Sequence, residues 1–548
     1  MGKNHKGNYV QMIGNVKPSV ENQSEAPIAT NKWLVTLAIS FGSLMGSIDA
    51  SIVNVALPQI RGSVGATIQE ITWIATGYAI AMVIIMPLTA FLGRRFGQKR
   101  IYLYCLGIFV VGSALCGMAR TLTYLVFSRF LQGFGAGALV PTQQAILRQT
   151  FPPREQAMAM AIFGMAIMLG PAIGPTLGGY IVDNWHWSWI FFINLPIGVL
   201  SILMVSLIVK EDPDILAKNA AQASAERKYV DWIGIALLSI GLSTLEYFLE
   251  EGARNDWFES TLIAACFGIS LVTLIGFVIR ELTFPVPAVN LRLFKDPVFT
   301  SGTLIGGVMF LTLMANMFLL PVFMQELLGF TAMQSGLALM PRVIVMLIAM
   351  PIVGRLYSKI DPRLIIANGI IFISIGAWDM SNLTLQSSSR DIVFANCVQG
   401  VGFACLFVPL TTVALSQIPR HRLADAAGLN SLIRQVGGAM GLAIFASLLS
   451  NYAVVARSSL SAHVTAVNPL IQIRMLTIKE WMMMLGKDEL TAQTIAVGSL
   501  QGAVVSQSMV IAFDRLFLLA GIMFMLVFPL LFFLKVSKEA LQSDKHVE

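Results

Sequence analysis

The feature that most constrains this chain is a series of apolar runs, each about 20 residues long, separated by short polar stretches. A helix needs roughly 20 apolar residues to cross about 30 Å of hydrocarbon, so each run is long enough to span a membrane. Membrane strands would alternate with a period of two in segments of about ten residues, a pattern this sequence lacks. Charged residues form 12% of the chain, against about 25% in soluble domains. The fold class predicted is therefore an all-α polytopic membrane protein.

Fourteen such runs predict fourteen transmembrane helices. They lie at about 33–58, 69–93, 101–118, 122–147, 156–182, 187–209, 231–250, 260–280, 298–325, 331–354, 364–385, 391–416, 424–450 and 512–535.

The distribution of basic residues predicts the orientation. With both termini in the cytoplasm, 25 of the 37 Lys and Arg fall in cytoplasmic segments, 8 fall outside and 4 lie within runs. This asymmetry follows the positive-inside rule and predicts that both termini are cytoplasmic. It also accounts for the net charge of +7, and since no RNP, zinc-finger or helix-turn-helix signature accompanies it, we expect no nucleic-acid partner.

The segment 451–511 is predicted to be the one long outside loop, too polar to span the bilayer. Its apolar stretch, Ile478–Leu485, is expected to lie against the membrane or a partner.

Two matches along the sequence indicate an internal repeat. FSRFLQGFG at 127–135 matches FANCVQGVG at 394–402 with an offset of 267, and MPLTAFLGRRFGQKR at 86–100 matches MPIVGRLYSKIDPRL at 350–364 with an offset of 264. Repeats of this kind are typical of secondary transporters with two parallel halves.

The repeat predicts a 6 + 2 + 6 arrangement of the fourteen helices. The predicted units are a cytoplasmic tail (1–32), a six-helix bundle (33–209), a linker with two inserted helices (210–297), a second six-helix bundle (298–535) and a cytoplasmic tail (536–548).

Asp49 is the one acid placed deep in a span, and a charge there is costly enough to favour a function. Desolvation would let such a carboxyl bind and release protons, although a permanent structural ion pair is the alternative. Arg129 lies in the fourth span, roughly 10 Å below the outer surface against roughly 13 Å for Asp49, so the two could interact. Arg129 is predicted either to tune the proton affinity of Asp49 or to form a structural hydrogen-bond centre with Gln132.

Two further groups of residues are candidate functional sites: a set of glycines and prolines in the fifth span, and a basic turn after the second span. Small residues and prolines in the fifth span predict tight packing with a kink, or a hinge and seal between the halves. The turn after the second span predicts either orientation by positive charge or a cytoplasmic gate that pairs with an acid on another helix. The first set is Gly164, Gly170, Pro171, Gly174, Pro175, Gly178 and Gly179; the second is Arg94, Arg95, Gly97, Lys99 and Arg100.

Polar residues elsewhere in the spans are candidate substrate or ion-pair groups: Gln132, Glu246, Arg342, Asp379 and Arg434. Arg342 and Asp379 lie in the outer halves of adjacent spans and are expected to pair. The sequence holds no nucleophile–base or metal constellation and no Walker-A motif, which argues against an enzyme or an ATPase. We expect no cofactor and no metal, with a proton gradient as the energy source.

Five segments resemble the fourteen-helix EmrB/QacA drug:proton antiporter branch of the major facilitator superfamily. They are Asp49–Pro58, Gly93–Arg100, Arg129–Gly137, Gly164–Gly179 and His186–Gly198. The resemblance implies a proton-driven exporter of hydrophobic or amphipathic toxic compounds, with Asp49 in the acidic first-helix motif and Arg129 in the basic fourth-helix motif.

The cytoplasmic loop motif departs from the family at two positions. Ala90 stands where the family usually has Gly, and Gly93 stands where it usually has Asp. A charge latch built on that Asp is therefore not expected here, although the basic residues remain.

The VNP at 467–469 and the length of the outside loop resemble EmrB-type permeases. That resemblance implies a periplasmic membrane fusion protein of the EmrA type and an outer-membrane channel of the TolC type as partners, besides membrane lipid and a lipophilic substrate. Two alternatives stay open. One is a dedicated exporter of a metabolite such as a siderophore or fatty acid; the other is a non-transporting membrane sensor or scaffold.

Overall fold

The computed structural model describes residues 31–210, 231–284, 287–419, 422–465 and 468–534, which contain helices and no strand. The prediction of an all-helical membrane protein is therefore confirmed for this part of the chain. Most of the predicted N-terminal tail, the start of the linker and the C-terminal tail lie outside the described residues.

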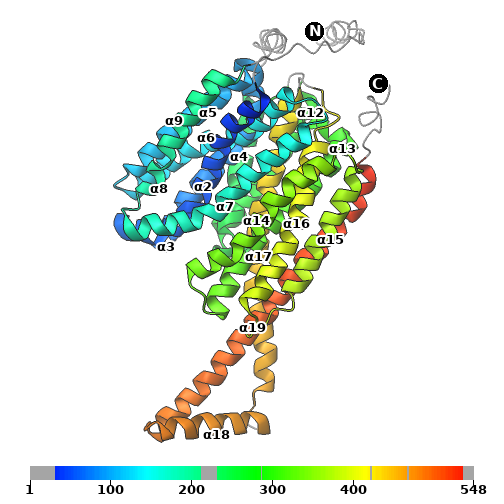
Figure 1. Cartoon of the computed structure of the whole chain (residues 1–548). Coiled ribbons are helices and arrows are strands. Elements are labelled where there is room, and N and C mark those ends of the chain that lie inside the picture. The colour runs from blue at the N-terminus through cyan, green and yellow to red at the C-terminus, as the bar shows by residue number, and fades with distance from the viewer. Residues whose placement is uncertain (1–30, 211–230, 285–286, 420–421, 466–467, 535–548) are drawn as a thin grey trace, which may run out of the picture.

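The N-terminal half packs as an antiparallel bundle (Figure 1). Two of its spans are interrupted, the second at Thr72 and the sixth at Ile193, where one short and one long helix meet. The helices are α2 (Lys32–Val64), α3 (Ile68–Ile71), α4 (Trp73–Phe96), α5 (Gln98–Gly117), α6 (Leu122–Thr150), α7 (Gln156–Asn184), α8 (Trp189–Phe192) and α9 (Asn194–Ile208).

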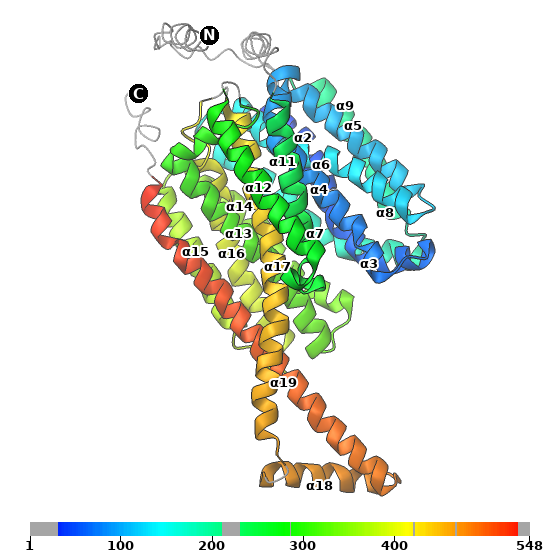
Figure 2. The same cartoon turned by 180° about the vertical axis from the view of Figure 1, so that it is seen from behind.

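Two long helices follow the first half, α11 (Trp232–Glu251) and α12 (Thr261–Thr283). They pack against each other, and α11 also contacts α4 and α17, one helix from each half (Figure 2). The pair therefore lies along the seam between the halves. Short 3-10 turns at Ala253–Asn255, Trp257–Glu259 and Leu291–Lys295 connect these helices to each other and to the second half.

The C-terminal half is a second bundle, in which α13 packs on α17, α15 on α16 and α14 on α16. Its elements are α13 (Pro297–Val322), the π-helical η4 (Phe323–Leu327), α14 (Ala332–Leu356), α15 (Pro362–Met380), α16 (Ser389–Val413), α17 (Leu423–His463), α18 (Pro469–Met484), α19 (Glu489–Val527) and η6 (Phe528–Phe533).

Thirteen helices among the described residues are long and apolar enough to cross a membrane. The fourth predicted span corresponds to α6, which is not one of these thirteen, although its 29 residues give about 44 Å of helix. It carries Arg129 and Arg148 and packs between α4 and α5. The count of fourteen spans and the 6 + 2 + 6 arrangement stay predictions.

The expectation of a long loop at 451–511 is wrong in its secondary structure. Helix α17 has 41 residues and α19 has 39, so each is roughly 60 Å long against about 30 Å of hydrocarbon. Both continue beyond the bundle, and α18 crosses between their tips (Figure 1). A polar segment need not span a bilayer to be helical, and this one is rich in strong helix formers such as Ala and Leu. We call residues 451–511 the outer extension.

The repeated glycines have the same structural function in both halves. A Cβ on Gly170 would lie 2.5 Å from the backbone of Ser47 in α2, and a Cβ on Gly437, its counterpart at the offset of 267, would lie 2.5 Å from the carbonyl oxygen of Gly307 in α13. Glycine thus permits a close helix approach at matching places in the two bundles.

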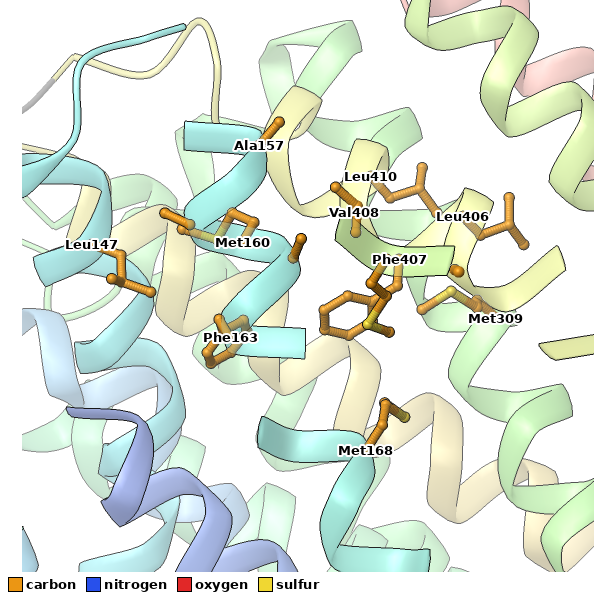
Figure 3. Close-up of a cluster of buried hydrophobic side chains, with 14 of the residues drawn as sticks. Leu147, Ala157, Met160, Phe163, Met168, Met309, Leu406, Phe407, Val408 and Leu410 are labelled. Atoms are coloured by element: carbon orange, nitrogen blue, oxygen red, sulfur yellow. The ribbon is translucent and has the colours of Figure 1, made fainter. Parts of the chain in front are cut away.

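An apolar cluster fills the contact between the halves at one end of the molecule. Figure 3 shows Met160 and Phe163 of α7 in one apolar cluster with Phe407 of α16. The rings of Phe163 and Phe407 have their centres 6.2 Å apart. Because α7 belongs to the first half and α16 to the second, this cluster joins the two bundles.

Candidate functional site

Asp49 of α2 and Arg129 of α6 meet inside the N-terminal half. Their side chains are 0% and 2% exposed, and Arg129 Nη1 donates a hydrogen bond of 2.6 Å to Asp49 Oδ2. The same Nη1 donates to Gln132 Oε1 at 2.8 Å. The two charged residues that helix depth placed at a similar level are thus in direct contact, and Gln132 lies beside them.

The second oxygen of Asp49 is also occupied. Gln132 Nε2 and Asn194 Nδ2 each donate to Asp49 Oδ1 at 2.9 Å, and Asn194 also donates to Ser113 Oγ at 3.0 Å. The guanidinium carbon of Arg129 lies 4.0 Å from the ring centre of Tyr78. Five helices, α2, α4, α5, α6 and α9, therefore supply one buried polar site.

Asn194, Ser113 and Tyr78 were not among the residues that the sequence suggested. Asn194 did carry a signal, since it is the one amide in the apolar run WIFFINLPIG. A buried amide needs a hydrogen-bond partner. Ser113 and Tyr78 carry no comparable signal, because both types are common in ordinary membrane helices.

This geometry allows two charge states. With Asp49 ionised, the buried ion pair is compensated by hydrogen bonds on both carboxylate oxygens. A proton on Asp49 would remove its charge and leave the Arg129 cation without its anion, which alters the attraction between α2 and α6.

The repeat-related positions of the second half form a neutral version of this site. An offset of 267 relates Asp49 to Asn316, Arg129 to Asn396, and Gln132 to Gln399. All three counterparts are fully buried, and Asn316 Nδ2 donates to Gln399 Oε1 at 3.4 Å. The scaffold is repeated, but the ion pair belongs to the first half alone.

The glycines of α7 divide into two groups. A Cβ on Gly164 would lie 2.6 Å from the ring of Phe407, so Gly164 lies at the contact between the halves. Gly170, Gly174 and Gly178 face α2 of the same half instead, which corrects the expectation of a seal between halves for these three. Gly179 has open space beside it. Pro171 and Pro175 lie inside the helix.

Two polar contacts join the halves at the end of the bundle where α2 begins. Arg94 at the end of α4 forms an ion pair with Asp425 at the start of α17, and Arg148 of α6 donates to the carbonyl oxygen of Thr412 in α16. We call this the inner end, since the basic residues predict that it faces the cytoplasm. A Cβ on Gly428 would lie 2.9 Å from the carbonyl oxygen of Met86, so α17 and α4 are also in close contact there.

Asp425 supplies the acid on another helix that a gate requires, and sequence reasoning missed it. Gly93, where the family has Asp, is covered by the side chain of Gln98. The rest of the basic turn does not join this pair. Arg95 and Arg100 are exposed, Lys99 Nζ donates to Ser206 O at 2.8 Å, and Gly97 makes the turn with a φ of 89°.

The remaining charged candidates are dispersed. Glu246 is 1% exposed on α11, and Asp379 is half-buried near the outer end of α15. Arg342 and Arg434 are 3% and 4% exposed. The expected ion pair between Arg342 and Asp379 is absent from the ion pairs formed by the described residues.

Comparison with known proteins fits this architecture. The family model described as Major Facilitator Superfamily matches residues 39–442. The chain belongs to this superfamily. The multidrug export protein EmrB of Haemophilus influenzae is 35% identical over 440 residues, covering 80% of this chain and 84% of that protein. The fatty acid resistance protein FarB of Neisseria gonorrhoeae is 32% identical over 502 residues, covering 91% and 96%.

A solved structure has the same fold. The human organic anion transporter MFSD10 superposes with a TM-score of 0.57 at 14% identity, covering 90% of this chain and 99% of that one. The predicted EmrB-type membership and multi-pass membrane character are therefore confirmed. The chain is a membrane transporter of this superfamily and not an enzyme, as the sequence predicted.

Proposed function

We propose that the chain is a drug:proton antiporter of the inner membrane, which exports hydrophobic or amphipathic toxic compounds from the cytoplasm or the inner leaflet. The observation that carries this proposal is the ion pair of Asp49 and Arg129, 0% and 2% exposed. Burying a carboxylate this deep in a membrane protein costs free energy, so the residue is expected to have a function. Protonation is the reaction open to it.

The coupling follows from the contacts of Asp49. A proton that enters from the outer side neutralises the carboxylate, weakens its attraction to Arg129 and favours release of the substrate. Loss of that proton to the cytoplasm restores the pair and resets the site. The halves rock between inward-open and outward-open states, and the ion pair of Arg94 and Asp425 supports an inner-closed member of that cycle.

The test is proton-driven uptake of a fluorescent lipophilic dye into inverted membrane vesicles. Wild type should accumulate dye and lose it with a protonophore, and Asp49→Asn should abolish gradient-driven accumulation while the protein stays folded. The matched control is Asn316→Ala, at the repeat-related neutral position, which should retain most of the transport. Full proton-driven transport by Asp49→Asn would refute the function given to Asp49.

The same proposal includes a tripartite pump with a periplasmic adaptor and an outer-membrane channel. The outer extension supports it, since α18 packs on α19 and exposes large apolar side chains. Leu470, Trp481 and Met484 are 75%, 58% and 83% exposed, and apolar patches of this kind favour a protein or membrane partner. Co-purification with an EmrA-type adaptor should fall when these residues become serine, with dye transport in vesicles unchanged.

A narrower substrate range is the second candidate. The relative FarB is named for fatty acid resistance, which favours export of fatty acids over siderophores among dedicated metabolites. A broad exporter should move several unrelated dyes, whereas a dedicated one should move a single class. A membrane sensor or scaffold would bind ligand without any gradient-driven flux, so the vesicle assay separates all three.

A further inference from the structure

Two arginines of the C-terminal half are buried and have no anionic partner among the residues that the structure describes. Arg342 of α14 and Arg434 of α17 are 3% and 4% exposed. The Nε and Nη2 atoms of both have no hydrogen-bond partner among the described residues, and neither arginine joins an ion pair there. A buried cation without an anion is strongly unfavourable. An anionic ligand that pairs with it removes this cost, which adds to the free energy of binding.

Both arginines lie near the middle of the bilayer. Arg342 comes 10 residues after α14 begins at the outer side, a depth of about 15 Å. Arg434 comes 11 residues after α17 begins at the inner end, or about 17 Å from the other side. In a hydrocarbon layer of about 30 Å, the two guanidinium groups are thus at a similar level. Substrate sites of transporters with repeated halves lie at this level.

An aromatic wall accompanies the two cations. The guanidinium carbon of Arg342 is 4.6 Å from the ring centre of Phe403, and that of Arg434 is 5.3 Å from Phe407 and 5.6 Å from Phe310. Phe403 and Phe407 are four residues apart on α16, so they lie on one helix face, one turn apart. The cations therefore lie along a single apolar strip.

This strip reaches the boundary between the halves. Phe407 contacts α7 of the first half, where Gly164 leaves room for its ring (Figure 3). Gly306 does the same for Arg434, since a Cβ there would lie 3.1 Å from Arg434 Nε. The helices that carry the arginines also contact the first half, α14 through α7 and α17 through α4 and α6. A movement of one half against the other would uncover the strip.

The buried arginine of the first half, by contrast, has an anionic partner. Arg129 also lies over an aromatic ring, that of Tyr78, but it donates to Asp49 at 2.6 Å. In the second half, the position related to Asp49 is Asn316, and no acid replaces it. The unpaired donors of Arg342 and Arg434 are therefore not a copy of the first site.

We propose that Arg342 and Arg434 bind the carboxylate of an amphipathic organic acid, whose apolar body lies along Phe310, Phe403 and Phe407. This inference rests on the proposed export function, because it names a substrate class for it. A guanidinium binds a carboxylate through two parallel hydrogen bonds. Aromatic and methionine side chains, such as Met350 beside Gly164, accept apolar bodies of varied shape.

The test measures binding of radiolabelled laurate to the purified full chain in nanodiscs, with empty nanodiscs subtracted. Unlabelled laurate should displace the label, and dodecanol, which has the same tail without the charge, should not. Arg342→Gln and Arg434→Gln should each raise the Kd for laurate by about tenfold or more, because each removes a charge-assisted hydrogen bond. The Arg→Lys variants should restore part of the affinity.

The matched control is Arg355→Gln, which removes an exposed arginine from the same helix as Arg342. It should leave laurate binding unchanged. Binding of tetraphenylphosphonium, a lipophilic cation, should be unaffected or tightened in Arg342→Gln and Arg434→Gln. Retained cation binding shows that these variants are folded. Laurate affinity that is unchanged in both variants, or dodecanol that competes as well as laurate, would overturn the proposal.

A lipid headgroup is the other source of an anion on an apolar body. Binding is therefore compared in zwitterionic and anionic nanodiscs. Equal laurate affinity in both supports an exported acid, whereas competition by anionic lipid that the Arg→Gln variants abolish would assign the site to lipid and overturn the substrate class. Proton-driven dye export is measured in parallel. If the wild type shows no proton-driven dye export, the proposed function is refuted. Laurate binding would still show whether the anion site exists.

Discussion

Removing the ion pair at the inner end should open that end of the molecule. Arg94 and Asp425 are 12% and 5% exposed, which lies between a surface pair and a fully buried one. Surface pairs contribute about 0–1 kcal/mol, and breaking a buried pair costs about 3–5 kcal/mol, so about 2 kcal/mol is expected here. At 1.4 kcal/mol per factor of ten, Asp425→Asn should shift the ratio of inner-open to inner-closed molecules by about 30-fold. An inner-open population of about 1% would rise to about 20%.

The measurement is a distance distribution by pulsed electron paramagnetic resonance. Spin labels at positions 100 and 359 replace an exposed Arg of α5 and an exposed Lys after α14, one from each half at the inner end. The five native cysteines, which are all free in the structure, are first replaced, and export is checked in that background. Wild type should show mostly a short distance. Asp425→Asn and Arg94→Gln should each add a longer one.

The control for charge alone is Arg95→Gln, because Arg95 is the next residue and is exposed. It should leave the distribution unchanged. The double variant Arg94→Gln with Asp425→Asn should open the end no further than either single change, since both remove the same pair. Wild-type distances in both single variants would refute the argument that this pair holds the inner end closed.

Two other predictions follow from the geometry. Gly164→Leu should prevent closure at the inner end, because the new side chain would meet the ring of Phe407; export should be lost while Gly179→Leu, at a glycine with open space beside it, remains active. In the outer extension, hydrogen bonds from the Thr491 side chain and backbone hold the pKa of Asp488 below its usual value. Because this pKa is depressed, the ionised Asp488 cap stabilises α19 at every pH above the usual Asp pKa of about 3.9. The stabilisation is lost only when the pH falls below that value. The protection factors of the α19 amides, which correct for the intrinsic pH dependence of exchange, should therefore be the same at pH 7 and pH 5, and lower protection at pH 5 would contradict the assignment.

What the sequence could predict depended on how local each signal is. A run of 20 apolar residues is a local property, so the helices of the bundle were found from the sequence. The depth of a residue along a helix is nearly local too, and it is enough to predict that Asp49 and Arg129 lie at a similar level and could interact. The outer extension was missed as a structure because a helix in water needs no apolar run. Its residues therefore resembled a loop when judged by hydropathy alone.

Contacts between distant segments carried no such signal. Asp425 lies 331 residues from Arg94, and nothing in the spacing of either residue points to the other. The expected pair of Arg342 and Asp379 failed for the same reason. Similar depth in adjacent spans does not fix which face of each helix a side chain occupies. Asp379 lies half-buried near the end of its helix, whereas Arg342 faces the interior of the bundle.

The internal repeat gives the two halves the same helix packing, but the buried charged residues differ between them. Gly170 and Gly437 make the same close helix contacts, so both halves are held together in the same way. Yet the first half holds a complete ion pair at Asp49 and Arg129, and the second half has amides at the equivalent positions. A symmetric pair of proton sites would give each half the same response to a proton. A proton site in the first half alone would confine that response to this half and leave the buried arginines of the second half free to bind a ligand, which is the division that an antiporter with separate proton and substrate sites requires.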